Sequence, residues 1–159
     1  MAQLKQLLRN IPEEKGAYLL WLQADRTKRL NLERLGEFDI IPGFYAYLGN
    51  AHGHGGLKIG IQHHLSNTTR HWHIDYLIPY TKPIEIWYAI GDRKLERLLA
   101  EILQETNKLK TPIPRFGASD YRRSRIPHLF YSKRQLSFQW FEQIISQNFE
   151  NLTMEQFKI

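Results

Sequence analysis

GAYLLWLQ, residues 16–23, is an almost unbroken apolar run with the length and composition of a buried β-strand. Two further runs share this character, FYAYLG at 44–49 and IEIWYAI at 84–90. LNLERLG at 30–36 alternates apolar and polar residues, and we expect it to be the hairpin partner of 16–23. The sequence therefore predicts a small, mostly antiparallel β-sheet.

Apolar residues at helical spacing lie around these strands. They occur in residues 2–10, in residues 57–66, in the stripe Leu95, Leu98, Leu99, Ile102 and Leu103, and in a closing stretch, residues 138–145. HWHIDYLI at 71–78 is too short for its pattern to decide between helix and strand. The sum predicts an α+β fold in which α-helices flank the sheet. We expect one domain over residues 1–145 and a frayed C-terminal tail over residues 146–159.

Composition limits the class of protein. At 159 residues, with 42% hydrophobic and 24% charged side chains, the chain is about one domain long and can form a core. The longest apolar run, residues 17–22, is too short to span a membrane. The absence of cysteine excludes disulfides, thiolate nucleophiles and cysteine-ligated zinc. The first residues lack an apolar stretch of signal-peptide length, so we expect a cytoplasmic location.

Basic charge is concentrated in one segment. The chain has 22 Lys and Arg against 16 Asp and Glu, hence +6. Residues 115–134 hold much of this excess, with only Asp120 opposing Arg115, Arg122, Arg123, Arg125, Lys133 and Arg134. Four aromatic residues are interleaved, namely Phe116, Tyr121, Phe130 and Tyr131. Guanidinium groups fit phosphate oxygens and aromatic rings stack on bases, so the segment favours nucleic-acid binding; a solvated basic loop is the alternative.

Two tyrosines stand two residues from a glycine, in Gly16-Ala17-Tyr18 and in Tyr47-Leu48-Gly49. In neighbouring strands of one sheet, these tyrosines could present their hydroxyls to the same side. The glycines would let backbone or substrate approach closely. Alternatively, both tyrosines are ordinary strand residues.

Glu96 is a candidate metal ligand. At about 100° per residue it lies at the margin of the leucine stripe, whereas Glu101 points away from it. A single carboxylate there could hold one hydrated Mg²⁺, because Mg²⁺ commonly takes one or two protein carboxylates and completes its shell with water and phosphate oxygens. The alternative is an ion pair with Arg93 or Arg97.

Six of the seven histidines fall within residues 52–73. If residues 71–76 are extended, His71, His73 and Asp75 share one face. This arrangement raises the possibility of a zinc site, but the spacing matches no established zinc template. Polar or phosphate-contacting histidines are the favoured interpretation, and a small-molecule hydrolase that uses the histidines is a third functional alternative.

Together these segments resemble the GIY-YIG nuclease superfamily, and more closely its bacterial and archaeal branch of uncertain function, which is similar to a module fused to endonuclease III in some archaea. The resemblance covers residues 14–132. It is carried by GAY at 16–18, GFYAYLGNA at 43–51, GGLKIGIQHHL at 55–65, HWHIDYL at 71–77, LERLLA at 95–100, FGASD at 116–120 and HLFY at 128–131. It implies a metal-dependent endonuclease acting on nucleic acid, with DNA as the expected class and one Mg²⁺ or Mn²⁺ ion.

The resemblance also assigns roles to residues. Tyr18 and Tyr47 would be the motif tyrosines, the second handling the attacking water, and Glu96 would hold the metal ion. His64 matches a histidine of the family pattern L-K-x-R-x-x-R-H-L, and Lys58 and His63 lie in the same stretch.

The sequence departs from the family at its arginines. Gly60 occupies the position of the arginine that stabilises the phosphate, and His63 replaces the second arginine. Lys58, His63 or His64 could substitute for the lost charge, although lysine lacks the guanidinium fork and histidine is only partly charged at pH 7. The resemblance therefore implies weakened hydrolysis, with a catalytically inactive nucleic-acid-binding module of the same fold as the alternative. Tyr121 and Arg123 replace two cysteines that the branch usually carries.

Overall fold

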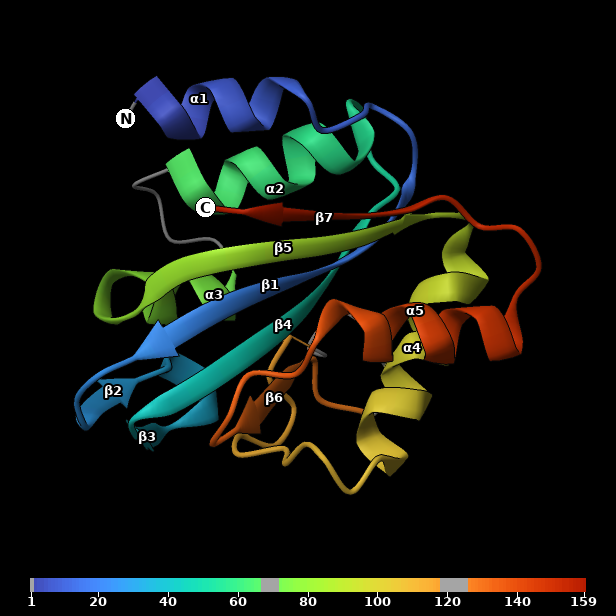
Figure 1. Ribbon diagram of the computed structural model, residues 1–159. Coiled ribbons are helices and arrows are strands. Elements are labelled where there is room, and N and C mark those ends of the chain that lie inside the picture. Colours follow the sequence, from blue (N-terminus) through green and yellow to red (C-terminus); the bar gives the residue numbers. More distant parts are fainter. Residues whose placement is uncertain (1, 67–71, 118–125) are drawn as a thin grey trace.

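The computed structural model describes residues 2–66, 72–117 and 126–159. Its centre is a five-stranded antiparallel sheet in the order β6-β4-β1-β5-β7 (Figure 1). The strands of this sheet are β1 (Gly16–Ala24), β4 (Gly43–Ala51), β5 (Lys82–Ile90), β6 (Leu129–Ser132) and β7 (Met154–Lys158). A second, two-stranded sheet pairs β2 (Lys28–Asn31) with β3 (Glu37–Ile40).

Five α-helices accompany the sheets in the described residues: α1 (Ala2–Arg9), α2 (Gly56–Ser66), α3 (His73–Leu77), α4 (Arg93–Glu105) and α5 (Phe138–Asn148). Short 3-10 turns occupy Glu33–Leu35 and Ile78–Tyr80. The predicted α+β class, a mostly antiparallel sheet with flanking helices, is confirmed. In the part of the chain that the structure describes, no helix has the length and apolar character needed to cross a membrane.

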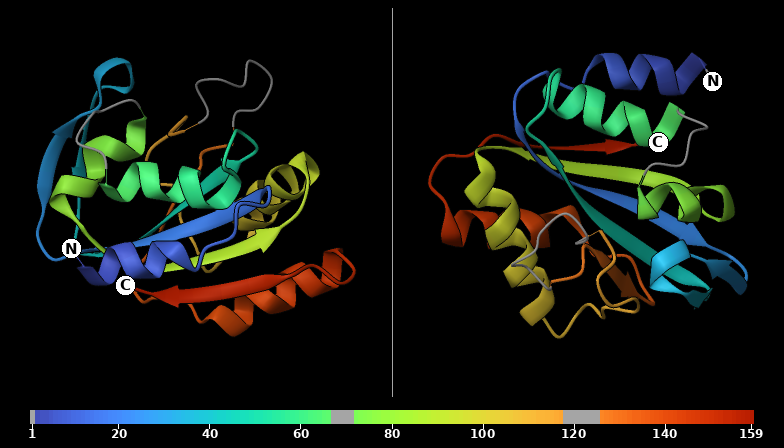
Figure 2. Two further views of the ribbon diagram at one scale, coloured as in Figure 1. Left: turned by 90° about the horizontal axis from the view of Figure 1, so that it is seen from above. Right: turned by 180° about the vertical axis from the view of Figure 1, so that it is seen from behind.

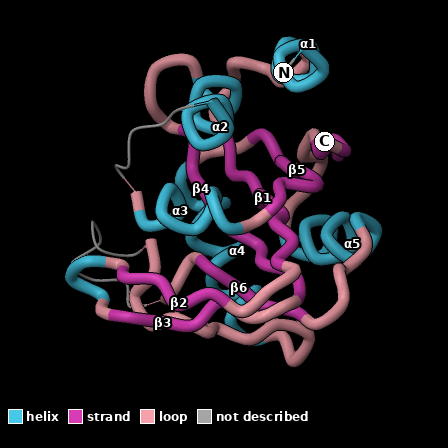
Figure 3. Tube along the Cα trace, turned by 90° about the vertical axis from the view of Figure 1, so that its left-hand side faces the viewer, coloured by secondary structure: helices cyan, strands magenta, loops and turns pink. Residues whose placement is uncertain are grey.

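Alternate residues of the strands form two separate cores on the two faces of the sheet. One face carries the buried tyrosines Tyr18, Tyr45, Tyr47 and Tyr88 and packs against α1, α2 and α3; we call it the tyrosine face. The other carries alanine, leucine and tryptophan and packs against α4 and α5; we call it the apolar face. Figures 2 and 3 show these helices on opposite sides of the sheet.

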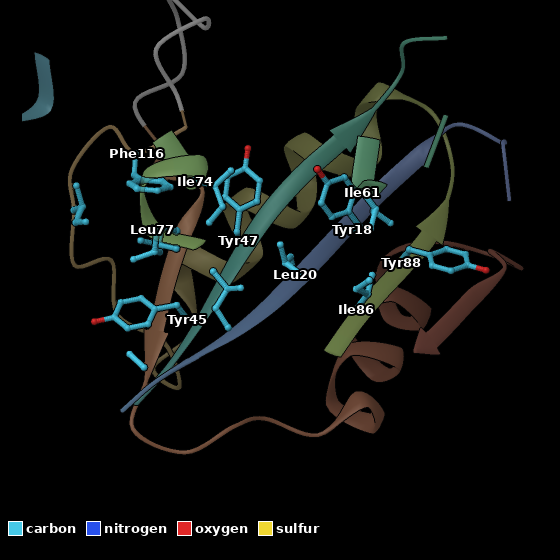
Figure 4. Close-up of a cluster of buried hydrophobic side chains, with 14 of the residues drawn as sticks. Tyr18, Leu20, Tyr45, Tyr47, Ile61, Ile74, Leu77, Ile86, Tyr88 and Phe116 are labelled. Atoms are coloured by element: carbon cyan, nitrogen blue, oxygen red, sulfur yellow. The ribbon is translucent and has the colours of Figure 1, made fainter. Parts of the chain in front are cut away.

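The register of β1 and β4 aligns the two tyrosine motifs. Tyr18 pairs with Gly49 and Leu20 with Tyr47, so both tyrosines project from the tyrosine face (Figure 4). A Cβ built on Gly49 would lie 2.2 Å from Cζ of Tyr18. The glycine of the second motif therefore makes room for the tyrosine of the first. Gly16 has a different role, because a Cβ there would lie 2.2 Å from the Ala89 carbonyl oxygen of β5.

Backbone hydrogen bonds fix the start of α2 beside β1. The amide of Leu57 donates to the carbonyl oxygen of Glu14, and that of Lys58 to the carbonyl oxygen of Pro12, each at a distance of 3.0 Å. These contacts satisfy two amides that have no partner within the helix. At α4, the Asp92 side chain accepts from the Lys94 amide at 2.9 Å, and the predicted leucine stripe packs on the apolar face.

Two local predictions are wrong, and one open choice is decided. Residues 30–36 do not pair with β1, because the 3-10 turn and Gly36, at φ 94°, return the chain so that β2 pairs with β3. The segment 71–78, whose pattern did not decide between helix and strand, is helical over His73–Leu77. The C-terminal tail is not frayed, because α5 continues to Asn148 and β7 adds to β5, where Phe157 stacks on Tyr88.

Candidate active site

A cleft of about 600 Å³ opens beside the ends of β1 and β4. Its walls come from β1, β4, α2 and α4 and from the segments that contain Trp72, Gly117 and His128. It brings together seven of the residues singled out from the sequence: Tyr18, Tyr47, Gly49, Gly60, His63, His64 and Glu96.

The two motif tyrosines lie edge to face inside the cleft. Their ring centroids are 6.5 Å apart, and Tyr18 is 1% exposed while Tyr47 is 7% exposed. Burial raises the pKa of Tyr18 well above its ordinary value, and the nearby Tyr47, Asp75 and Glu96 raise it further. Tyr18 is therefore a protonated phenol at neutral pH, able to donate a hydrogen bond but not to act as a base.

His64 reaches the tyrosines from the inner face of α2. Its ring centroid is 5.5 Å from that of Tyr47 and 6.3 Å from that of Tyr18. His64 Nδ1 lies 3.0 Å from Oδ1 of the buried Asp75, whose Oδ2 accepts from the Trp72 amide at 3.0 Å. A carboxylate accepts only, so we assign a proton to Nδ1 of His64. In the neutral ring, Nε2 is then the acceptor.

Glu96 enters the same cleft although its helix packs on the opposite face of the sheet. The short strand β6 pairs with β4 only as far as Tyr47, and beyond it the edge of β4 meets His128, whose carbonyl oxygen accepts from the Leu48 amide at 2.8 Å. Glu96 Oε1 lies 3.6 Å from Nδ1 of His128, and both residues are buried. The Glu96 carboxylate thus lines the cleft at an edge of β4 that β6 leaves uncovered.

His128 brings no positive charge to Glu96 at neutral pH. Burial lowers the pKa of His128 to about 4, against the opposing effect of a hydrogen bond with the Leu48 backbone. The imidazole is therefore neutral at pH 7 and does not form an ion pair with the carboxylate. The alternative pairing of Glu96 with Arg97 does not occur, since Arg97 pairs with Glu101 at 3.5 Å.

Gly60 lines the cleft beside Tyr18. A Cβ built there would lie 3.5 Å from Cβ of Ala51 and 3.7 Å from Cε1 of Tyr18, which are ordinary van der Waals distances. No steric reason for glycine exists at this position, in contrast to Gly49 and Gly56. A longer side chain at position 60 would begin beside Tyr18, on the wall of the cleft.

Residues 17–151 match the family described as a domain of unknown function, DUF123. The chain belongs to the DUF123 family. This family is GIY-YIG-like. No curated protein and no solved structure shows a significant match to the chain.

Other predicted contact residues of this DUF123 chain lie outside the cleft. Lys58 is on α2 with its Nζ 3.8 Å from Glu13 Oε1, and Arg115 is exposed two residues before the cleft residue Gly117. Gly16 supports the packing of β1 against β5. Arg122, Arg123 and Arg125, together with Tyr121, lie outside the described residues.

The expectation that the interleaved aromatic residues stack on bases is wrong for two of them. Phe116 and Phe130 are fully buried, so neither can stack on a base; both are core residues. The condition for a shared histidine face is not met, because His73 and Asp75 lie in the helix α3. His71 lies outside the described residues. Among the residues that are described, no three histidine or acidic side chains group closely enough to hold a metal ion.

The sequence interpretation assigned no role to two residues that line the DUF123 cleft, Trp72 and His128, or to Asp75, which pairs with His64. Asp75 appeared only as part of the supposed histidine face, and His128 only as the first letter of HLFY. Their place in HWHIDYL and HLFY is a signal that they belong to the family pattern, but it gives no role. The contacts of Asp75 with His64 and of His128 with Glu96 join segments that are distant in the chain.

Proposed function

We propose that this protein is a metal-dependent nucleic-acid phosphodiesterase of GIY-YIG type, with DNA as its expected substrate and a rate limited by the missing arginine. One observation carries the proposal. Two phenols, an Asp75-paired His64 and the Glu96 carboxylate line a single cleft although they come from four different elements. These are the kinds of group that phosphodiester hydrolysis requires.

Hydrolysis needs a water that loses a proton, stabilisation of charge on the phosphate, and stabilisation of the leaving oxygen. His64 has its Nδ1 proton directed at Asp75, so its Nε2 can accept a proton from water directly or by way of the Tyr47 hydroxyl. Tyr18 remains protonated and can donate a hydrogen bond to a phosphate oxygen. The two tyrosines thus have different tasks, set by their surroundings.

The residues present fit one Mg²⁺ or Mn²⁺ ion. Glu96 would hold it, since a single carboxylate beside a neutral His128 supplies the negative charge that such an ion requires. When bound, the ion would supply Lewis-acid stabilisation of charge on the phosphate and on the leaving oxygen. The cleft is large enough for a phosphate group and water beside Glu96.

The glycine at position 60, in place of the arginine expected there, lowers the expected rate of hydrolysis. It also favours a second candidate function. Loss of one preorganised cationic group commonly lowers catalysis by about 10²–10³-fold. His63 and His64 line the cleft, but an imidazole lacks the guanidinium fork that an arginine would present to the phosphate. The same observation favours a non-catalytic nucleic-acid-binding module, which would keep the fold and the basic charge without the reaction.

A cleavage assay on four proteins tests the proposal. Nicked, branched and single-stranded DNA are incubated with Mn²⁺ or Mg²⁺ and the wild type, Glu96→Gln, Tyr47→Phe or Gly60→Arg. We expect slow wild-type cleavage that requires metal, loss of cleavage in Glu96→Gln, and a fall of about 10²-fold or more in Tyr47→Phe. Gly60→Arg should accelerate cleavage, because position 60 lies on the cleft wall and a Cβ there meets only ordinary van der Waals contacts.

Glu101→Gln is the matched control, since Glu101 is on the same helix but its side chain is 43% exposed and faces Arg97. It should cleave like the wild type. Cleavage by Glu96→Gln at the wild-type rate would contradict the assigned role of Glu96. If the wild type is silent and Gly60→Arg cleaves, the chain is the binding module with a lesion at position 60; if both are silent, the catalytic proposal is wrong.

A further inference from the structure

Trp72 is an exposed indole on the wall of the cleft. It is 46% exposed, whereas Trp21 and Trp87 are fully buried and Trp140 is half-buried. Five large hydrophobic side chains are exposed in the described residues, and two of them, Trp72 and Ile59, line this cleft. Exposed apolar side chains that line a cleft are typical of a binding surface.

The indole is held on a rigid support. Its backbone amide donates to Oδ2 of Asp75 at 3.0 Å, while Oδ1 of the same carboxylate is 3.0 Å from His64. The helix that follows Trp72 is anchored by Ile74 and Leu77, which are fully buried in the core of the tyrosine face. One buried carboxylate therefore ties the exposed ring to the histidine of the proposed reaction.

The chemistry around Trp72 selects among ligands. The cleft is lined by His54, His63, His64 and His128 and, among the residues that the structure describes, by Glu96 as the only acidic side chain. The N–H of His64 is directed at Asp75, but an N–H of the other imidazoles can donate to a phosphate oxygen. A flat indole face suits a nucleobase.

We propose that Trp72 is a stacking platform for an unpaired nucleobase next to the phosphate in the cleft. This inference rests on the proposed function and narrows its substrate class to nucleic acid with at least one unstacked base, as in a single strand, a flap or a branch. A base inside a continuous duplex has both faces covered by its neighbours, so it cannot stack on the indole without being extruded.

Binding in EDTA tests the inference without cleavage. A ten-nucleotide oligothymidine and a blunt duplex of the same length are titrated into the wild type, Trp72→Ala, Trp72→Phe and Tyr80→Ala. Intrinsic fluorescence reports stacking on Trp72 in the proteins that keep it, and anisotropy of a labelled oligonucleotide gives the affinity of all four. Tyr80 is the matched control because it is 45% exposed but lies outside the cleft, with Lys28 Nζ 5.0 Å from its ring centroid.

We expect the single strand to quench the wild-type fluorescence and to bind more tightly than the duplex. Trp72→Ala should weaken single-strand binding by about 5- to 150-fold, as loss of one base–aromatic stack does. Trp72→Phe should retain most of the affinity, and Tyr80→Ala should bind like the wild type. Circular dichroism checks that each variant is folded.

Equal affinity of Trp72→Ala and wild type for the oligothymidine overturns the inference, and so does an equal loss in Tyr80→Ala. Equal binding of duplex and single strand also overturns it. These outcomes are separate from those of the cleavage assay. A protein that cleaves DNA while Trp72→Ala binds normally would keep the proposed function and lose the stacking platform, whereas a silent protein with the expected binding pattern would keep the platform alone.

Discussion

The two faces of the sheet come from alternate residues of the same strands, yet they differ in chemistry. On the apolar face, Trp21 and Trp87 pack with their ring centroids 5.0 Å apart, under helices whose inner residues are leucine, isoleucine and phenylalanine. On the tyrosine face, the rings of Tyr18 and Tyr47 lie next to His64, and all three residues line the cleft. The comparison indicates that the apolar face mainly contributes to stability. The tyrosine face, in contrast, places polar side chains in a cleft.

Glu96 is an exception to the separation of the two faces. Its helix packs on the apolar face, with Leu95 and Leu99 fully buried there, but its carboxylate lines the cleft of the tyrosine face. The short β6 makes this possible, because the edge of β4 beyond Tyr47 has no strand beside it among the described residues. A longer β6 would close the path between the faces.

The apolar face should contribute most to stability. Trp21→Ala removes a fully buried indole from the contact with Trp87, and we expect a loss of about 3–5 kcal/mol in the free energy of unfolding. Urea denaturation measures it. Trp72→Ala is the matched control and should change that free energy much less, by about 0.5 kcal/mol, since the residue is 46% exposed. Similar losses in the two variants would contradict the division of roles.

The sequence predicts most of the fold because the central elements have clear apolar patterns. β1, β4 and β5 are nearly continuous apolar runs, and the leucine stripe of α4 repeats at helical spacing. β7 was missed because MEQFK has only Met154 and Phe157 as apolar residues and gains its stability by pairing with β5. An edge strand of this kind is defined by its neighbour and not by its own pattern.

Part of the site was predictable for the same reason. Helical arithmetic placed Glu96 at the margin of the buried stripe, and the residue is 5% exposed. Asp75 and His128 could not be predicted, because their partners His64 and Glu96 belong to other segments. The aromatic residues Phe116 and Phe130 were misassigned because composition alone does not separate a stacking ring from a core ring.

Gly49→Ala should disrupt the packing of the Tyr18 ring on the tyrosine face. The new Cβ would lie 2.2 Å from Cζ of Tyr18, so the ring must move, and we expect a loss of about 1–3 kcal/mol in the free energy of unfolding. Gly53→Ala is the control in the same cleft, since nothing lies within 4 Å of its Cβ position. In a double-mutant cycle with Tyr18→Ala, the cost of Gly49→Ala should largely disappear, and additive losses would refute the fit.

Alkaline pH should lower the free energy of unfolding through the buried tyrosines of the tyrosine face. Burial raises the pKa of Tyr18 well above 10, and that of Tyr88 to about 12, so the folded chain retains protons that the unfolded chain releases above pH 10. Stability is therefore full below pH 10 and falls as pH rises further. Tyr18→Phe should reduce the slope of unfolding free energy against pH; an unchanged slope would contradict the assignment.

Gly60→Ala should have the smallest effect and the opposite sign. The new methyl group meets Cβ of Ala51 at 3.5 Å without overlap, and alanine restricts the unfolded chain and favours the helix, so we expect a gain of roughly 0.5–1 kcal/mol. Gly56→Ala is the contrasting control on the same helix, because its φ is 55° and its Cβ would lie 2.0 Å from the Glu13 carbonyl oxygen. It should destabilise the fold. If Gly60→Ala also destabilises it, the tyrosine face requires glycine there, and the open wall beside Tyr18 cannot accept an arginine without cost.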